Sequence, residues 1–277
     1  MRNLYIFLFI LNLLLISCNK SKTPAVVESE AQEDSIRANA DTIGIDSNEV
    51  APPKAVDELF ADFIFSYSTN KSFQYRRTDF PLKEYRNGRL FNRINRIDWK
   101  FDKIYYTHSL HIIILDSEKT LNNIIGVKTD TVKADRLLFK QKSCKQYVFA
   151  KEQGVWRLAY INIMRLSAHS DAGFLSFYQK FATDTTFQMR HLSESIDFTT
   201  YDADNHYKKL DGIIDNSQWE AFRPELPAND VFCLDYGLPL TSKNTRIVSV
   251  RGNSNGMSSM FKFRLIKGVW KLVKFEN

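Results

Sequence analysis

The pattern of apolar and polar residues divides residues 55–277 into helical stretches, each followed by stretches with the alternation of strands. Within 55–70, apolar residues recur at the spacing of one face of an amphipathic helix, at Val56, Leu59, Phe60, Phe63, Ile64 and Tyr67. Asp57 and Glu58 fall in the first turn, where the helix dipole favours acidic side chains. The spacing therefore predicts a helix over 55–70.

Downstream of this helix the pattern changes to period two, which is typical of strands. In the first half the stretches with this pattern are 104–116, 123–133, 136–140, 144–152 and 155–163. In the second half they are 230–236, 244–251, 258–266 and 269–275. Gln153-Gly154 and Lys267-Gly268 supply a hairpin turn before the last strand of each half. Helices followed by a run of strands predict an α+β fold, with helices on one face of a curved antiparallel sheet.

The chain contains one unit twice. Gly154-Val155-Trp156 returns as Gly268-Val269-Trp270, at an offset of 114 residues (268 − 154). A Phe-Gln-x-Arg motif ending at Arg76 returns at Arg190 with the same offset (190 − 76). We predict two tandem domains, at 55–166 and 167–277. The Trp of each closing strand is expected to pack against the helix of its own unit, not to contact a ligand.

The N-terminus has the pattern of an export signal. Arg2 precedes an apolar run over 4–16, which is too short to span a bilayer comfortably. The run ends in Leu15-Ile16-Ser17-Cys18, which resembles the lipobox of bacterial lipoproteins. This resemblance implies removal of 1–17 and lipidation of Cys18, and hence a membrane anchor facing the periplasm or the cell surface. The alternative is an ordinary short signal or anchor that contains a cysteine.

Composition and charge separate a tether from a globular part. Residues 18–54 are rich in Ser, Asn, Ala, Asp and Glu, which predicts a disordered tether. The formal charge of +6 lies in 55–166, where 20 Lys and Arg face 12 Asp and Glu, whereas 167–277 has 13 of each. Because the chain is expected to be exported, this basic character does not indicate a nucleic-acid partner.

Two cysteines remain beside Cys18, one in each half. Cys144 and Cys233 have neither a CxxC partner nor a neighbouring histidine, so no metal site is expected there. Two buried thiols are favoured over a disulfide bridge, although export would permit a bridge.

The order of elements resembles a known fold. A long helix, a short second helix and a meander closing on a Gly-x-Trp strand resemble the cone-shaped nuclear-transport-factor-like (cystatin-like) fold. Several motifs resemble an uncharacterised family of bacterial lipoproteins common in gut anaerobes: Phe-Gln-x-Arg, Asp98-Trp99, Asp116-Ser117-Glu118-Lys119 and Lys145-Gln146-Tyr147. The resemblance implies two tandem cone-like domains, each with a pocket between its helices and the concave face of its sheet. It supplies no catalytic residue, since the family has no assigned activity.

Some enzymes with cone folds use a carboxylate paired with a histidine or tyrosine in an apolar pocket. Asp116, His108 and Tyr75 are the candidates for this chemistry here. His108 and Asp116 are eight residues apart on one predicted strand, about 26 Å when extended, so they cannot form a dyad directly. His111 would point to the other face. The alternative is that these are polar residues at strand ends and on the surface.

Arginines supply two candidate anion sites. Arg76 and Arg190 occur in both copies and could hold an anion, or could pair with Asp79 and Asp197 and brace the helix corner. Four further arginines recur at helical spacing: Arg86, Arg89, Arg93 and Arg96. Such a stripe could bind phosphate-bearing lipid headgroups or acidic glycans, or could be a solvated face, and Asn87-Gly88 interrupts the helical pattern.

The chain has no Gly-rich phosphate loop, no Gly-x-Ser-x-Gly, no HExxH and no Cys/His cluster, so no metal and no cofactor is expected. The sequence predicts a lipid-anchored envelope protein with a non-enzymatic binding or scaffolding role. Its partner would be a small amphiphile, a glycan or another envelope protein. The alternative is a pocket enzyme of the isomerase or hydrolase type.

Overall fold

The computed structural model describes residues 54–202, 204–253 and 255–277. The predicted signal peptide, the lipidation site Cys18 and the tether up to residue 53 lie outside these ranges. Within them, no helix is both long and apolar enough to cross a membrane. The α-helices of the described ranges are α1 (Phe60–Thr69), α2 (Lys71–Arg76), α3 (Glu118–Asn122), α4 (Ala172–Thr183), α5 (Thr185–Arg190) and α6 (Trp219–Phe222).

Helix α1 confirms the amphipathic helix predicted from the spacing of apolar residues. The buried residues on its core face include Phe60, Phe63, Ile64 and Tyr67. The helix begins at Phe60, preceded by the 3-10 turn Lys54–Asp57. In that turn the Asp57 carboxylate accepts hydrogen bonds from the Arg77 guanidinium (2.8 and 3.1 Å) and from the Trp156 backbone N–H (3.0 Å). This buried ion pair fixes the start of α1 against α2 and the closing strand.

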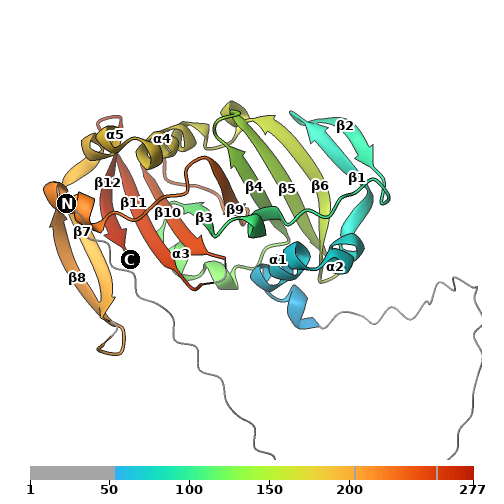
Figure 1. Cartoon of the computed structure of the whole chain (residues 1–277), viewed down its shortest axis with the longest axis horizontal. Coiled ribbons are helices and arrows are strands. Elements are labelled where there is room, and N and C mark those ends of the chain that lie inside the picture. The colour runs from blue at the N-terminus through green and yellow to red at the C-terminus, as the bar shows by residue number, and fades with distance from the viewer. Residues whose placement is uncertain (1–53, 203, 254) are drawn as a thin grey trace, which may run out of the picture. The chain divides into compact units, whose positions relative to one another are not determined.

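All strands belong to one 12-stranded sheet with the order β2-β1-β6-β5-β4-β9-β3-β10-β11-β12-β7-β8 (Figure 1). In the first half they are β1 (Thr78–Arg86), β2 (Arg89–Ile94), β3 (Leu110–Leu115), β4 (Thr131–Leu138), β5 (Ser143–Glu152) and β6 (Val155–Arg165). In the second half they are β7 (Leu192–Asp202), β8 (Lys208–Asp215), β9 (Asp230–Asp235), β10 (Thr245–Gly252), β11 (Ser258–Ile266) and β12 (Val269–Glu276). The α+β class is thereby confirmed.

Strands β3 and β9 are exchanged between the two halves. β9 pairs with β4 of the first half, β3 pairs with β10 of the second half, and β3 and β9 meet in parallel at Ile112 and Cys233. The predicted pair of separate antiparallel sheets, dividing at residue 166, is corrected here, because one sheet runs through both halves. The β1–β6 and β7–β12 pairs are also parallel.

The exchange has a physical reason in the apolar run of β3. Ile113 and Leu115 pack into a first core, which includes Phe63 of α1, while Ile112 packs into a second core, which includes Phe177 of α4. A strand that is apolar on both faces must be covered on both faces. Between the two halves each face of β3 meets a different core, which a strand within a single cone would not achieve.

Equivalent contacts recur in the two halves, at the offset of the repeated sequence motifs. The parallel pair Thr78–Leu158 returns as Leu192–Leu272, again 114 residues later. Buried Gln74 accepts a hydrogen bond from Trp99 Nε1 (3.1 Å), and buried Gln188 accepts one from Trp219 Nε1 (3.0 Å). These pairs explain the Gln of the Phe-Gln-x-Arg motif as a scaffold residue that ties the second helix of each half to a tryptophan.

Three predicted elements differ in the structure. The strand predicted over 104–116 is a 3-10 turn at Ile104–Thr107 followed by β3. The strand predicted over 123–133 starts only with β4, after the 3-10 turn Ile124–Gly126. The arginine stripe is not a helix but the β1–β2 hairpin, because Asn87 (φ 49°) and Gly88 (φ 76°) form its turn.

Helix α3 of the first half is bonded to the second half of the sheet. The Glu118 carboxylate binds Lys262 Nζ of β11 (2.6 Å) and Lys274 Nζ of β12 (2.7 Å). Burial raises the pKa of Glu118, but hydrogen bonds from both lysines outweigh this, and the net pKa is lowered. The Asp-Ser-Glu-Lys motif therefore anchors the exchanged strand.

Both cysteines in the described ranges are free and buried, which confirms the preference for thiols. Cys144 on β5 and Cys233 on β9 flank β4, where they pair with Leu137 and Asp135. With strands about 4.8 Å apart, the two Cα atoms are about 10 Å or more from each other, beyond the reach of a disulfide. Burial raises the pKa of both thiols.

Candidate functional site

The main cavity lies where the exchanged strands meet the start of α1, and we call it the seam pocket. Its volume is about 890 Å³. Its walls come from the start of α1, the segment 125–130, the β5–β6 hairpin and the ends of β3, β9 and β10. Because β9 and β10 belong to the second half, neither half could form this pocket alone.

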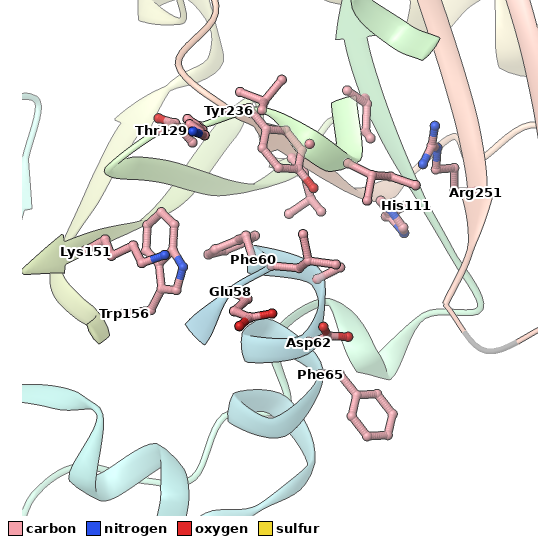
Figure 2. Close-up of a pocket in the computed structure, with 18 of the residues that line it drawn as sticks. Glu58, Phe60, Asp62, Phe65, His111, Thr129, Lys151, Trp156, Tyr236 and Arg251 are labelled. Atoms are coloured by element: carbon pink, nitrogen blue, oxygen red, sulfur yellow. The ribbon is translucent and has the colours of Figure 1, made fainter. Parts of the chain in front are cut away.

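Aromatic rings form the floor of the seam pocket. The Phe60 ring lies edge-on to Trp156 (centroids 5.1 Å apart, 74°) and to Tyr236 (6.1 Å, 80°). Figure 2 shows Phe60 and Tyr236 approaching each other across the pocket, with Trp156 beside Lys151 on one side. Such a floor offers apolar faces to a ligand body.

Trp156 carries an unsatisfied donor. Its indole Nε1 is buried and has no hydrogen-bond partner among the described residues, whereas the indoles of Trp99 and Trp219 are bonded to glutamines. Figure 2 draws the Trp156 nitrogen on the side of the ring that faces Phe60 and Glu58. A buried donor without an acceptor costs about 1–3 kcal/mol, so an acceptor placed here would gain that amount.

Charged side chains of both signs surround this floor. Glu58, just before α1, and Asp62 in its first turn form an acidic side. Lys151 lies with its Nζ 5.6 Å from the Trp156 ring centroid, and Arg251 lies on the opposite side of the pocket (Figure 2). The pocket therefore combines an apolar floor with a polar rim, which suits an amphiphilic ligand.

His111 is the buried titratable group of the pocket wall. Its Nδ1 lies 2.6 Å from Asn253 Oδ1, and Asn253 Nδ2 donates to the His108 carbonyl (2.6 Å). Burial lowers the pKa of His111, the Asn253 hydrogen bond opposes this, and the charge of Arg251 lowers it further. The net pKa is below the ordinary value, so the ring is neutral at pH 7.

Tyr236 brings a phenol to the same wall. Burial raises the pKa of its hydroxyl, and the charge of Arg251 partly offsets this. The phenol therefore stays protonated at neutral pH and can donate a hydrogen bond to a ligand.

The corresponding surface of the second half is different. Glu58, Asp62 and Phe65, in α1 or just before it, correspond 114 residues later to Ala172, Ser176 and Gln179. These line a smaller cavity of about 610 Å³ with the segments 139–142 and 165–167. The second half thus keeps the helix but not its acidic residues, and the charges of this cavity come from Lys142 and Arg165.

None of the predicted candidate residues lines the seam pocket. The Tyr75 hydroxyl donates to the Trp99 carbonyl, and its ring packs near Phe80. Asp116 accepts hydrogen bonds from Ser242 N–H (2.6 Å) and Thr241 Oγ1 (3.1 Å). Slight burial raises the pKa of Asp116, but these hydrogen bonds lower it by more than burial raises it. The net pKa of Asp116 is therefore below its ordinary value.

His108 belongs to a structural network. Its Nε2 lies 3.5 Å from Asp230, which Arg136 binds with two nitrogens (Nη2 at 2.6 Å). Asp102 accepts a hydrogen bond from the Tyr147 hydroxyl (2.5 Å) and forms an ion pair with Lys145 (3.3 Å). His108 and Asp102 are thus each bonded to side chains of the neighbouring strands.

Arg76 and Arg190 are exposed at the C-terminal ends of α2 and α5. Asp79, one of the expected partners, instead pairs with Arg157. The buried arginine is the next residue, Arg77, which binds Asp57. Anion binding by Arg76 and Arg190 therefore stays a prediction, and neither residue lines the seam pocket.

The hairpin arginines lie at the outer end of the sheet. Arg86 and Arg89 face each other across the turn, and the Arg86 guanidinium carbon lies 3.5 Å from the Phe91 ring centroid. Arg93 lies on β2 and Arg96 follows it. Their binding to phosphates or glycans stays a prediction.

Sequence patterns gave no signal for the residues of the seam pocket. Trp156 was expected to pack, and it does, in the same geometry as Trp270 against Phe174 (5.2 Å, 73°). Its place in one pocket with Tyr236 and Arg251 depends on the strand exchange. No cluster of His, Cys, Asp and Glu in the described residues has the arrangement of a metal site.

Comparison with known proteins decides the family. Residues 39–277 match the family described as "Domain of unknown function (DUF4348)". The chain belongs to this family. No curated protein matches it. An NTF2-like protein from Bacteroides fragilis NCTC 9343, whose crystal structure is known, is similar at 31% identity and a TM-score of 0.72.

The likeness covers 80% of this chain and 96% of the Bacteroides chain. That share, about 222 residues (0.80 × 277), is longer than either half, so the similarity takes in both. The DUF4348 chain thus has an NTF2-like fold, as its sequence resemblance implied.

Proposed function

We propose that this DUF4348 chain is a lipid-anchored envelope protein with a non-enzymatic ligand-binding or scaffolding role. Its ligand is a small amphiphile bound in the seam pocket. The observation that supports this most is the buried Trp156 Nε1–H, a donor without an acceptor, beside the Phe60 and Tyr236 rings. An apolar ligand body would pack on these rings, and an acceptor atom would complete the hydrogen bond of Trp156.

The dimensions and charge of the pocket support the same ligand class. Its volume of about 890 Å³ lies within the usual range of small-molecule sites, roughly 300–1,000 Å³. Lys151 and Arg251 offer cations to a polar end that carries acceptors, and Tyr236 offers a neutral donor. Glu58 and Asp62 would disfavour a ligand that is anionic along its whole length.

Anionic anilinonaphthalene sulfonate is a suitable probe, since it has an aromatic body and an acceptor group. We expect one probe to bind per chain, and the double variant K151Q/R251Q to weaken binding about tenfold. The control R76Q/R190Q removes the same charge away from the pocket and should leave binding unchanged. Equal losses in the two variants, or no saturable binding, would refute the pocket as the site.

The envelope location rests on the lipobox at Leu15-Ile16-Ser17-Cys18. A chain expressed in bacteria with radiolabelled palmitate should become labelled, and C18A should not. Labelling that persists in C18A would exclude this residue as the lipidation site.

A pocket enzyme is the second candidate, and one observation favours it. His111 is buried in the pocket wall and oriented by Asn253, an arrangement that a general base requires. Turnover of aryl ester probes that is lost in H111Q but not in H108Q would support catalysis. Binding of the amphiphile without turnover would favour the non-enzymatic role.

A further inference from the structure

The sheet has two open edges, one in each half. β2 pairs only with β1, and β8 pairs only with β7, so each leaves a row of backbone N–H and C=O groups without a strand partner (Figure 1). All of β2 except Ile94 and all of β8 except Ile214 are exposed. Open edges of this kind can pair with another strand.

The two edge hairpins carry opposite charges. The β1–β2 hairpin, residues 78–94, holds four Lys and Arg against two Asp and Glu, a net charge of +2 (4 − 2). The β7–β8 hairpin, residues 192–215, holds two against six, a net charge of −4 (2 − 6). The acidic residues here are Glu194, Asp197, Asp202, Asp204, Asp211 and Asp215. The two ends of one sheet therefore carry charges of opposite sign.

Both hairpins also expose large apolar side chains. On β2 these are Leu90 and Phe91 (56% exposed), and on β8 they are Leu210 and Ile213 (71% exposed). Exposed apolar groups among charges of one sign are typical of a surface that is covered by a partner.

The strand directions fit a continuation of the sheet. Followed across the ladder of pairings, β2 and β8 run in the same direction. A second copy in the same orientation would therefore bring its β8 alongside β2 of the first in a parallel pair. Like ends would repel, since +2 would face +2 or −4 would face −4.

We propose that copies of this chain associate head to tail, the basic β1–β2 hairpin of one copy docking on the acidic β7–β8 hairpin of the next. The contact is heterologous, so it extends to chains of copies and does not stop at a symmetric dimer. The proposed lipid anchor would hold copies of the chain close to one another on the membrane surface. The association itself does not depend on the anchor or on the seam pocket.

Charge reversal on each end tests the proposal. We expect the full chain to sediment as dimers and larger species at low salt, with association about tenfold weaker near 1 M salt. The variant R89E/R93E changes the net charge of the β1–β2 hairpin from +2 to −2, and D204K/D211K changes that of the β7–β8 hairpin from −4 to zero; each alone should sediment as a monomer. All four side chains are exposed, so both variants should stay folded, which their unfolding midpoints check.

Mixing the two variants distinguishes this contact from others. R89E/R93E retains a native β8 end and D204K/D211K a native β2 end, so an equimolar mixture should form a dimer that grows no further. A monomeric parent chain, association retained by either variant alone, or no dimer in the mixture would overturn the proposal. Binding of the monomeric parent to vesicles rich in anionic lipid, lost in R89E/R93E, would overturn it too and assign the basic hairpin to the membrane.

Discussion

The two halves of the sheet share their scaffold and differ in what surrounds one cavity. Phe60 and Trp156 in the first half pack as Phe174 and Trp270 do in the second, with centroid distances of 5.1 and 5.2 Å. Around this shared pair the residues diverge. The seam pocket is lined by Glu58, Asp62, Lys151 and Arg251, whereas the positions 114 residues away from these are Ala172, Ser176, Leu265 and Leu137.

This difference separates packing from recognition. A duplicated fold must keep the residues that hold its helices on its sheet, and the glutamine–tryptophan bonds and aromatic pairs are kept in both halves. The acidic side chains of the seam pocket are not needed for packing, and the equivalent helix positions in the second half are Ala172 and Ser176. The rim of the seam pocket is therefore the part of the molecule that is best explained by a ligand.

The largest predicted difference between the halves concerns two equivalent aspartates. Asp57 (9% exposed side chain) binds Arg77 (4%) and the Trp156 N–H, while Asp171 binds Arg246, and both of those side chains are 11% exposed. Breaking a buried ion pair leaves the other charge without compensation, at about 3–5 kcal/mol. We expect D57N to lower the free energy of urea unfolding by that amount and D171N by less. A larger loss in D171N would contradict the comparison.

The buried glutamines give a smaller difference of the same kind. Gln74 makes four hydrogen bonds, to Tyr67 O, Asp102 O, Trp99 Nε1 and Asp102 N. Gln188 makes three, the weakest being 3.4 Å to Arg223. We expect Q74L to cost about 2–3 kcal/mol and Q188L about 1 kcal/mol less, measured by urea unfolding. Equal losses would mean that the Asp102 bonds contribute nothing.

Much of this scaffold could be predicted from the sequence. The core face of α1, the hairpins at Gly154 and Gly268, and the duplication follow from periodicity and from turns with positive φ. The β1–β2 hairpin also had a local signal in Asn87-Gly88, but the helical spacing of the arginines obscured it.

The seam pocket could not be predicted, because it depends on which strand pairs with which. The apolar run 112–115 predicts a strand buried on both faces but does not say that β9 comes between it and β4. Only that exchange brings Tyr236 and Arg251 into one pocket with Trp156. Trp156 and the pair Tyr236 and Arg251 are far apart in the sequence. No periodicity or motif in a single sequence therefore indicates that they line one pocket.

A pH-dependent effect distinguishes His111 from Val231, which occupies the equivalent position in β9. The folded-state pKa of His111 is lowered by burial, so the unfolded chain binds the proton more tightly. Its stabilising contribution is present above the ordinary pKa of about 6.5 and is lost as the pH falls through the folded value. We expect H111V to lose less unfolding free energy than the parent chain between about pH 7 and about pH 5. Parallel curves would show that this ring does not titrate on unfolding.

The most direct test of ligand binding in the seam pocket replaces the indole N–H of Trp156. Replacing its indole by benzothiophene puts sulfur in place of the N–H and keeps the ring volume, and the same change at Trp270 is the control. If a ligand acceptor satisfies this donor, the change at Trp156 should weaken binding of anilinonaphthalene sulfonate about tenfold, while the free protein is as stable as before or more so. The change at Trp270 should leave binding unchanged. Unaltered binding in both proteins, measured by titration calorimetry, would contradict the account.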